Sequence, residues 1–281
     1  MYHDVALARG LVDSTGARHR RVRLRPPTGH VELGLAGRRA DAPGPDDADE
    51  LLAGCVARIG EFHDVTPSLT AALTRGDRAR LALAIRTLLH GDAILLIVEC
   101  PAAGCGALAD LTLRTHELLG ETRTAQALSI AVSTADGDVE VRPPTGADDR
   151  AAAGADDELW GRLVSRAGQP IGAAGWHRLA PTSHQQIAMA LSGLDSCADL
   201  AFVCACPRCG CWIELELDAV DLLTRTLATG EHRLLAEVHC LAFHYGWPES
   251  DILALPRPRR FAYLELLCDQ LEGRPLTRAG A

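Results

Sequence analysis

The pentapeptide Arg-Pro-Pro-Thr-Gly occurs twice in this chain of 281 residues, at positions 25–29 and 142–146. Each copy ends a short alternating segment, 22–25 or 139–142, so each predicts a strand that is closed by a Pro-Pro turn. Chance does not account for the recurrence of an identical pentapeptide. The repeat therefore constrains the chain to a fold that contains one unit twice, which is too few copies for a solenoid.

The elements expected after the first pentapeptide are a helix and two strands. Apolar residues at spacings of three and four predict a helix over 77–90, with Gly91 after its last turn. A run of apolar residues predicts a strand over 94–99, and a second strand is expected near 108–113. These two strands flank a segment that contains two cysteines.

The second pentapeptide is followed by elements in the same order. Thr182 or Ser183 is expected to cap a helix that runs to Leu191, and strands are expected near 200–203 and over 212–217. We therefore predict an α+β fold, in which a duplicated strand–helix–hairpin unit with cysteine knuckles is followed by a C-terminal helical segment.

The chain divides into four expected parts: a first repeat unit at 1–120, a link at 121–136, a second repeat unit at 137–228 and a helical segment at 229–281. In the last part, an apolar stripe at spacings of three and four predicts an amphipathic helix that packs against the protein's own sheet. The residues of this stripe are Phe261, Leu264, Cys268 and Leu271.

Two cysteine pairs lie at matching places in the two units. Cys206 and Cys209 form a C-P-x-C-G motif, and Cys100 and Cys105 form a version of it that is wider by two residues. A tight turn with glycine after its second cysteine directs both sulfurs toward one ion, and a structural zinc takes four such ligands in a tetrahedron. We predict that the four thiolates form one zinc site that locks the two units face to face.

Other uses of the same thiols stay open. Cys204, Cys206, Cys209 and Cys211 also supply four sulfurs, although four ligands within so short a segment are crowded. Cys204 and Cys211 alternatively lie opposite each other at the base of a hairpin, as a contact or a latent disulfide. In a third interpretation the site has decayed and the thiols only pack.

The charge and hydropathy patterns limit the function classes. A net charge of −9 argues against a general nucleic-acid binder. An arginine-rich segment, 18–25, precedes an acidic run between Asp41 and Glu50, and we interpret the two as a solvated strand edge and a solvated loop. Apolar runs such as 93–98 are far shorter than the roughly 20 residues that span a bilayer. No signal peptide is visible, so we expect a cytoplasmic protein without membrane insertion.

No motif of a familiar enzyme class is present. The chain contains no lysine, so it has no G-x-x-x-x-G-K-[ST] phosphate loop, and it has no G-x-S-x-G motif. A dithiol enzyme that uses Cys206 and Cys209 would place its thiol at a helix N-terminus, but residues 212–217 alternate like a strand. We expect a non-enzymatic protein, with a thiol-dependent redox enzyme as the less favoured alternative.

Taken together, the motifs resemble one protein family. Arg-Pro-Pro-Thr-Gly before an acidic helix start, C-P-x-C-G before a Glu-Leu-Glu-Leu strand, and the tail from Phe243 to Leu264 are similar to the T-even-phage baseplate-hub assembly protein family. Members occur in contractile phage tails and in bacterial contractile injection systems. The resemblance covers most of the chain, is most specific in the tail, and departs from the family at a Pro- and Asp-rich insertion, Asp41 to Asp49.

The resemblance implies a non-enzymatic assembly factor, or a minor structural component, of the baseplate or hub of a phage-tail-like contractile injection system. Such a protein has hub, spike, tape-measure or wedge proteins as its partners. The alternative is a zinc-ribbon-like adaptor that binds proteins unrelated to contractile machines.

The tail itself has two interpretations. Pro248 fits the start of a helix, and Glu249 fits the positive end of that helix. The corner is then either an internal helix–helix junction or a docking corner for a hub, spike or tape-measure protein. The side chains that would form the docking corner are Trp247, Ile252, Leu253, Arg257 and Arg260.

Overall fold

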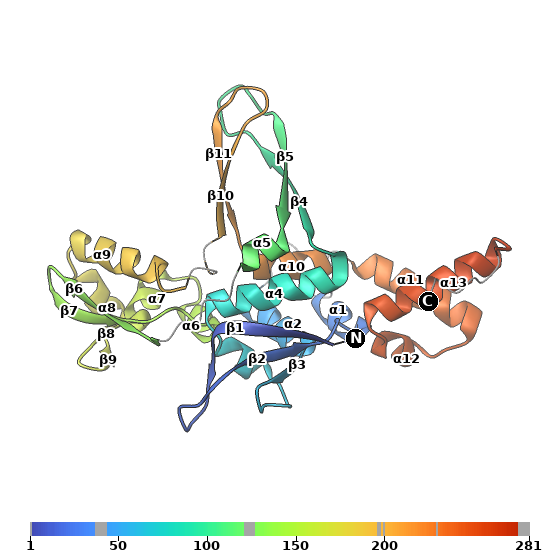
Figure 1. Ribbon diagram of the computed structural model, residues 1–281, viewed down its shortest axis with the longest axis horizontal. Coiled ribbons are helices and arrows are strands. Elements are labelled where there is room, and N and C mark those ends of the chain that lie inside the picture. Colours follow the sequence, from blue (N-terminus) through green and yellow to red (C-terminus); the bar gives the residue numbers. More distant parts are fainter. Residues whose placement is uncertain are drawn as a thin grey trace.

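A computed structural model describes residues 2–36, 44–120, 127–195, 198, 200–228 and 230–274 (Figure 1). The strands are β1 (His3–Val12), β2 (Arg18–Leu24), β3 (Val56–Ile59), β4 (Ala93–Glu99), β5 (Leu108–Arg114), β6 (Ile130–Thr134), β7 (Gly137–Val141), β8 (Val164–Arg166), β9 (Gln169–Pro170), β10 (Leu200–Ala205) and β11 (Trp212–Leu217). The helices are α1 (Gly29–Ala36), α2 (Pro45–Cys55), α3 (Pro67–Ala71), α4 (Arg75–His90), α5 (Thr115–Leu119), α6 (Gly146–Ala152), α7 (Asp156–Leu163), α8 (Gly172–His177), α9 (Pro181–Ser192), α10 (Ala219–Ala228), α11 (Glu231–Tyr245), α12 (Glu249–Ala254) and α13 (Arg257–Leu271). Helices and antiparallel strands both contribute, which confirms the expected α+β class.

The strands form two sheets in the body and one projecting arm. β1, β2 and β3 pair in that order in the first sheet, and β6, β7, β8 and β9 pair in that order in the second. β4 with β5, and β10 with β11, form two separate hairpins, which rise together from the body and meet at their tips (Figure 1). We refer to these two hairpins, 93–114 and 200–217, as the arm. Among the described residues, no helix is both long and apolar enough to cross a membrane.

The main core surrounds α4, the helix predicted over 77–90. The helix begins two residues earlier because the Thr74 hydroxyl caps it, accepting a hydrogen bond from the Asp77 amide at 3.3 Å. Leu81 and Ile85 of α4 are fully buried in one cluster with side chains of the first sheet, such as Leu24. The base of the arm closes over this core, since Ile94 of β4 also belongs to the cluster.

Asp77 also fixes β1, a strand that the sequence patterns did not predict. Its buried carboxylate accepts hydrogen bonds from the backbone amides of Ala8, Arg9 and Gly10, at 2.7, 3.1 and 2.7 Å. The pairing register between β1 and β2 shifts at these residues. A side chain therefore satisfies strand amides at the irregularity.

The second Arg-Pro-Pro-Thr-Gly segment docks on the start of α4. The Pro144 carbonyl accepts a hydrogen bond from the Arg75 amide at 2.9 Å, and the Gly146 amide donates to the Leu73 carbonyl at 3.3 Å. The second half of the chain is thereby attached to the first half.

The first segment makes the same two bonds with the C-terminal helices. The Pro27 carbonyl accepts from the Arg257 amide at 3.2 Å, and the Gly29 amide donates to the Leu255 carbonyl at 3.3 Å. Each copy of the pentapeptide thus binds the residues that begin a long helix. The second copy binds the start of α4, and the first copy binds the start of α13.

The glycine of each segment is required by this close approach. A Cβ atom on Gly29 would lie 2.8 Å from Leu253 Cδ2 and 2.9 Å from Leu253 Cα. A Cβ atom on Gly146 would collide with the guanidinium of Arg78. The repeated glycine is therefore explained by packing against another part of the chain.

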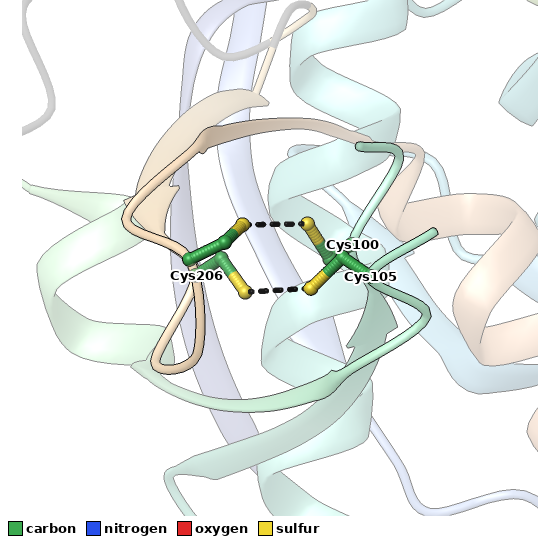
Figure 2. A group of neighbouring side chains, drawn as sticks. Cys100, Cys105 and Cys206 are labelled. Carbon is green, nitrogen blue, oxygen red and sulfur yellow. Dashed lines mark hydrogen bonds between the residues drawn. The ribbon is translucent and has the colours of Figure 1, made fainter. Parts of the chain in front are cut away.

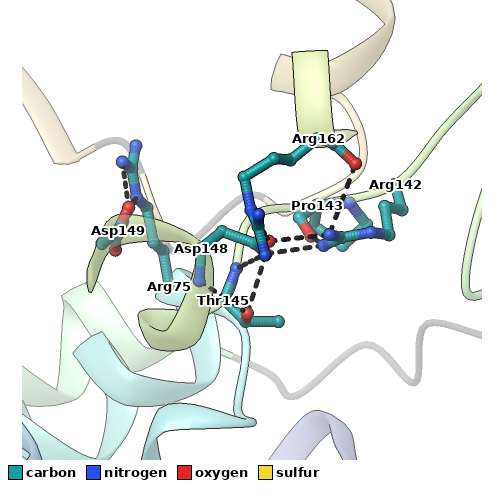
Figure 3. Close-up of polar contacts among 7 residues, drawn as sticks. All are labelled: Arg75, Arg142, Pro143, Thr145, Asp148, Asp149 and Arg162. Carbon is teal, nitrogen blue, oxygen red and sulfur yellow. Dashed lines mark hydrogen bonds and ion pairs between the residues drawn. The ribbon is translucent and has the colours of Figure 1, made fainter. Parts of the chain in front are cut away.

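Polar side chains strengthen the second junction (Figure 3). The guanidinium of Arg142 donates to both carboxylate oxygens of Asp148, at 2.6 and 2.7 Å. Asp148 and Thr145 form a reciprocal capping box at the first turn of α6. Arg75 of α4 forms an ion pair with Asp149. The first turn of α6 is thus bound to its own strand and to the other half of the chain.

The two halves share most of their element order. Each has two paired strands, two helices, a third strand, two further helices, a hairpin of the arm and a last helix, with β9 as the additional strand of the second half. Descent of the halves from one duplicated unit stays a prediction, as does the division into four parts.

The acidic run, where the structure describes it, is not a solvated loop. Residues 45–55 form α2, and Asp49 within it is fully buried. Its carboxylate pairs with Arg78 of α4 and Arg150 of α6, so two guanidinium groups compensate the buried charge. Residues 41–43 lie outside the described residues. The arginine-rich strand β2 is likewise central in its sheet and not an edge.

The predicted docking corner is interior, which corrects that prediction. Its side chains are buried or, for the first, half-buried: Trp247, Ile252, Leu253, Arg257 and Arg260. Arg260 donates to Glu32 at 2.7 Å and to Glu237 at 3.1 Å. The corner therefore joins α12 and α13 to α1 and α11, and the helix–helix interpretation of the tail is the correct one.

The same ion pairs set the orientation of α13. Phe261, Cys268 and Leu271 of the predicted apolar stripe are exposed, whereas Arg260 and Leu267 are buried. The helix packs on α11 and not on a sheet. Leu264 of the stripe does pack on the core of the C-terminal helices, but the other three do not, because a buried arginine, which hydropathy assigns to the surface, selects the inner face.

The predicted cap of α9 is also wrong. The helix begins at Pro181, and Ala180 precedes it without a side-chain cap. Proline fits this first position because its missing N–H has no helical partner there. The Ser183 hydroxyl instead donates to Asp136 at 2.7 Å.

Part of the expected link at 121–136 is a strand. β6 lies within it and pairs with β7 as a full member of the second sheet. Residues 121–126 lie outside the described residues.

Candidate metal centre

The two predicted cysteine pairs meet at the tip of the arm. The Sγ atoms of Cys100, Cys105, Cys206 and Cys209 all lie within 4.8 Å of one another. Cys100 Sγ is 3.6 Å from Cys209 Sγ, and Cys105 Sγ is 3.8 Å from Cys206 Sγ. Figure 2 shows Cys100 and Cys105 on one hairpin facing Cys206 on the other. The predicted proximity of the four thiols is confirmed.

These separations fit the coordination shell of one ion. With metal–sulfur bonds of about 2.3 Å, the sulfurs of a tetrahedral site lie about 3.8 Å apart. A disulfide needs about 2.05 Å, and all four cysteines are free thiols. The cluster therefore has the ligand number and spacing of a tetrahedral metal site.

The widened knuckle closes its hairpin in the same way as the short one. The Cys100 amide donates to the Ala107 carbonyl at 2.9 Å, and the Cys206 amide donates to the Cys211 carbonyl at 2.8 Å. Each acceptor lies two positions after the second cysteine of its knuckle. The two additional residues are accommodated in the loop before Cys105, so the insertion leaves both thiol pairs in equivalent positions.

The glycine after each second cysteine has the backbone conformation that the motif predicts. Gly106 has φ +54° and Gly210 has φ +72°. This left-handed region is readily accessible to glycine, and it turns the chain sharply behind the cysteine. The glycine of the C-P-x-C-G motif is thus explained by the backbone conformation that the knuckle requires.

The cluster is enclosed on one side and accessible on the other. Cys100 and Cys206 are buried, Cys105 is half-buried and Cys209 is exposed. Arg208 donates through Nη1 to the carbonyl of Cys105 at 3.1 Å, which is a second link between the knuckles. The sequence patterns left Arg208 as the unspecified position of the motif, and no local signal identifies this role.

Backbone amides stabilise the thiolate form of Cys206. The amides of Cys209 and Arg208 lower the pKa of Cys206 to about 6. The pKa of Cys100 is raised to about 12: the Ala102 amide acts against the rise, but burial and the neighbouring thiols exceed it. One thiolate suppresses ionisation of its neighbours by charge repulsion, and a bound cation would remove that repulsion.

An apolar shell supports the thiols. Ala109 of β5 and Ile213 of β11 are buried in the same cluster as Cys100 and Cys206. The inner faces of both hairpins therefore pack on each other below the cluster, which fixes the relative position of the two knuckles.

The alternative thiol arrangements are not formed. Cys204 pairs in register with Ile213, and the Cys206 amide bonds to Cys211, so Cys204 and Cys211 do not lie opposite each other. Neither belongs to the group of four sulfurs.

Comparison of the chain with protein-family models, curated proteins and solved structures gives no match. The resemblance to the baseplate-hub assembly family therefore stays a prediction that rests on the motifs.

Proposed function

We propose that this chain is a non-enzymatic assembly factor that binds other proteins through a rigid arm closed by a structural zinc. The observation that carries the proposal is the group of four cysteine sulfurs at the joined tips of two hairpins. Four thiolates complete the tetrahedral shell of zinc and leave no position for water or substrate, which is typical of structural sites. A tetrahedral set of four sulfurs also suits iron, so the metal must be identified by measurement.

The motif resemblance supports a more specific role. We propose that the protein is an assembly factor or minor component of the baseplate or hub of a contractile injection system. Its partners would then be hub, spike, tape-measure or wedge proteins. With the tail corner buried, the arm becomes the candidate contact region, because it extends away from the body (Figure 1).

A zinc-ribbon-like adaptor outside contractile machines is the second candidate, and the same cysteine group favours it equally. The two candidates share the metal site and differ in the partner. A thiol-dependent redox role would instead require Cys206 or Cys209 to act as a free nucleophile, which bound zinc would prevent.

The metal site is tested by elemental analysis of the purified protein. Wild type is expected to carry about one zinc per chain, and Cys206→Ser and Cys209→Ser are expected to carry almost none. Cys211→Ser is the matched control, since Cys211 is an exposed thiol two residues from Cys209 and outside the group. A wild type without metal, or one with the absorption spectrum of iron, would refute the zinc assignment.

The partner is tested by affinity purification of the tagged protein from its native host, beside purified particles. Hub, spike, tape-measure or wedge proteins in the eluate of the wild type, and their loss with Cys206→Ser, support the baseplate role. Presence in the particles then indicates a structural part, and absence indicates an assembly factor. Enrichment of other proteins alone supports the adaptor.

A further inference from the structure

The outer faces of the arm carry large apolar side chains. Side chains alternate along each strand, so the residues between the packed inner positions point away from the opposite hairpin. Five of these outward side chains are between 61% and 76% exposed. They are Leu95, Ile97, Leu108, Val203 and Trp212. The first three lie on the outer face of β4–β5 and the last two on the outer face of β10–β11. Exposed apolar side chains on a strand face indicate a contact surface.

Carboxylates stand beside these apolar side chains. On the first hairpin, Ile97 lies opposite Asp110. On the second, Val203 lies opposite Glu214, and Glu216 follows on the same strand. A surface of this kind fits a partner face that carries positive charge together with apolar stems.

The same chain carries such a face on the first sheet. Val22 and Leu24 of β2 are buried, so Arg21 and Arg23 point to the other side of the strand. Arg25 follows directly after the strand, is exposed, and donates through Nε to the Gly54 carbonyl at 3.0 Å. Arg58 of β3 adds to this face, because it pairs in register with Arg23. We refer to Arg21, Arg23, Arg25 and Arg58 as the arginine face. Asp4 pairs with Arg23 across the strand, and the face remains positive as a whole.

The two surfaces match in spacing. Trp212, Glu214 and Glu216 recur at every second position of β11, as do Arg21 and Arg23 of β2 and Arg25 directly after it. Both rows therefore have a spacing of about 6.7 Å. Two Glu–Arg pairs and one guanidinium stacked on the Trp212 ring would form in a single register.

One molecule cannot form this contact with itself. The arm rises from one side of the body, and the β1–β2–β3 sheet lies on the opposite side (Figure 1). A contact between different patches of two identical chains joins the copies head to tail.

We infer that copies of this protein associate head to tail, with the outer face of β10–β11 in one copy seated on the arginine face of the next. This inference goes beyond the proposed function and does not depend on the identity of the external partner. The contact is electrostatic in large part, so it weakens as salt is added.

Sedimentation velocity of the purified zinc-loaded protein tests the inference. The sedimentation coefficient of the wild type is expected to rise with concentration up to about 100 µM, and to rise less at high salt. Glu214→Arg/Glu216→Arg and Arg21→Glu/Arg25→Glu are each expected to weaken association at least about tenfold. Asp110→Arg, at the equivalent place on the other hairpin, is the control that leaves association unchanged.

An equimolar mixture of the two charge-reversed variants decides the pairing. The intact arm of one variant then meets the intact arginine face of the other, and the reversed arm meets the reversed face, so association is expected to return. Melting temperature and zinc content confirm that each variant is folded. A wild type that stays monomeric, a mixture that does not associate, or equal weakening by Asp110→Arg would each overturn the inference. A wild type that associates with itself but captures no hub, spike, tape-measure or wedge protein would count against the proposed function alone.

Discussion

The sulfur atoms of Cys100 and Cys209 lie 3.6 Å apart, although 109 positions separate the two residues in the sequence. The contact joins a hairpin of the first half to a hairpin of the second half at a point far from the main core. Near the tip the buried apolar residues beside the cysteines are few, Ala109 and Ile213, whereas Ile94, Leu113 and Leu217 at the base belong to the main core. The arm is therefore expected to depend on the metal more than the body does.

Metal removal is predicted to loosen the arm and to spare the body. After treatment with a chelator, amide exchange in β4, β5, β10 and β11 is expected to accelerate at least about tenfold, because the hairpins lose the link at their tips. Exchange in the buried helix α4 is expected to change little. Hydrogen–deuterium exchange with mass spectrometry measures both. Uniform acceleration across the chain would show that the metal holds the whole fold together.

Replacement of the glycine of the first pentapeptide is predicted to destabilise the fold. Gly29→Ala places a Cβ atom 2.8 Å from Leu253 and is expected to lower the free energy of unfolding by about 1–3 kcal/mol. Gly34→Ala in the same helix is the control, because no atom lies within 4 Å of its added Cβ. The control is expected to be neutral or stabilising by up to about 1 kcal/mol. Chemical denaturation compares them, and equal effects would contradict the docking explanation.

Arg260 is predicted to be essential for the attachment of the C-terminal helices. Arg260→Met leaves Glu32 buried without its guanidinium partner and Glu237 with Arg233, at 3.6 Å, as its remaining one, so a loss of about 3–5 kcal/mol is expected. Arg259→Met changes an exposed arginine next to it and is expected to have an effect within about 0.5 kcal/mol. Thermal and denaturant unfolding measure the difference, and similar losses in both variants would refute the role of the ion pair.

The Arg260→Met defect is predicted to depend on pH. Burial already raises the pKa of Glu32, against the hydrogen bond from Arg260 that lowers it. Without the arginine the pKa rises further, so the folded variant binds a proton more tightly than the unfolded chain. Its stability is then gained as the pH falls toward the ordinary value of about 4.3 and lost as the pH rises. The deficit relative to wild type is expected to be smaller at about pH 5 than at about pH 8, and a constant deficit would contradict this.

Asp148 is predicted to contribute to resistance against acid. Although burial opposes its ionisation, hydrogen bonds from Arg142 and Thr145 hold the pKa of Asp148 well below its ordinary value. Its stabilising contribution is present above the unfolded value of about 3.9 and is lost as the pH falls below it. Asp148→Asn is expected to cost about 2 kcal/mol at neutral pH, and less as acid is added. Asp138→Asn, at an exposed position, is the control in the same pH titration.

Local patterns predicted most of the elements that later carry the site. The helix α4 and the strands β4, β5, β10 and β11 follow from apolar spacing within short windows. The turn at Cys206–Gly210 is likewise predictable from adjacent residues, because the knuckle itself needs a glycine with positive φ. Signals of this kind involve neighbours in the sequence, so they can be read without the fold.

Burial was the property that sequence patterns predicted poorly. Asp49 and Arg260 are fully buried although both residue types are ordinarily exposed, and Phe261 is exposed although it belongs to an apolar stripe. Each outcome depends on a partner far along the chain, such as Arg78 for Asp49. The charge of a side chain can be read from the sequence, whereas the distant partner that compensates this charge cannot.

The sequence by itself determined the α+β class, the positions of the hairpins and the four cysteines that can share one ion. Only the tertiary structure decided that these cysteines meet, that each Arg-Pro-Pro-Thr-Gly segment docks on a distant helix, and that the tail corner is interior. The physical reason is that hydrogen-bonded turns and strand alternation are fixed by adjacent residues. Docking and burial instead depend on contacts between Gly29 and Leu253, or Cys100 and Cys209, which form only when the whole chain is folded.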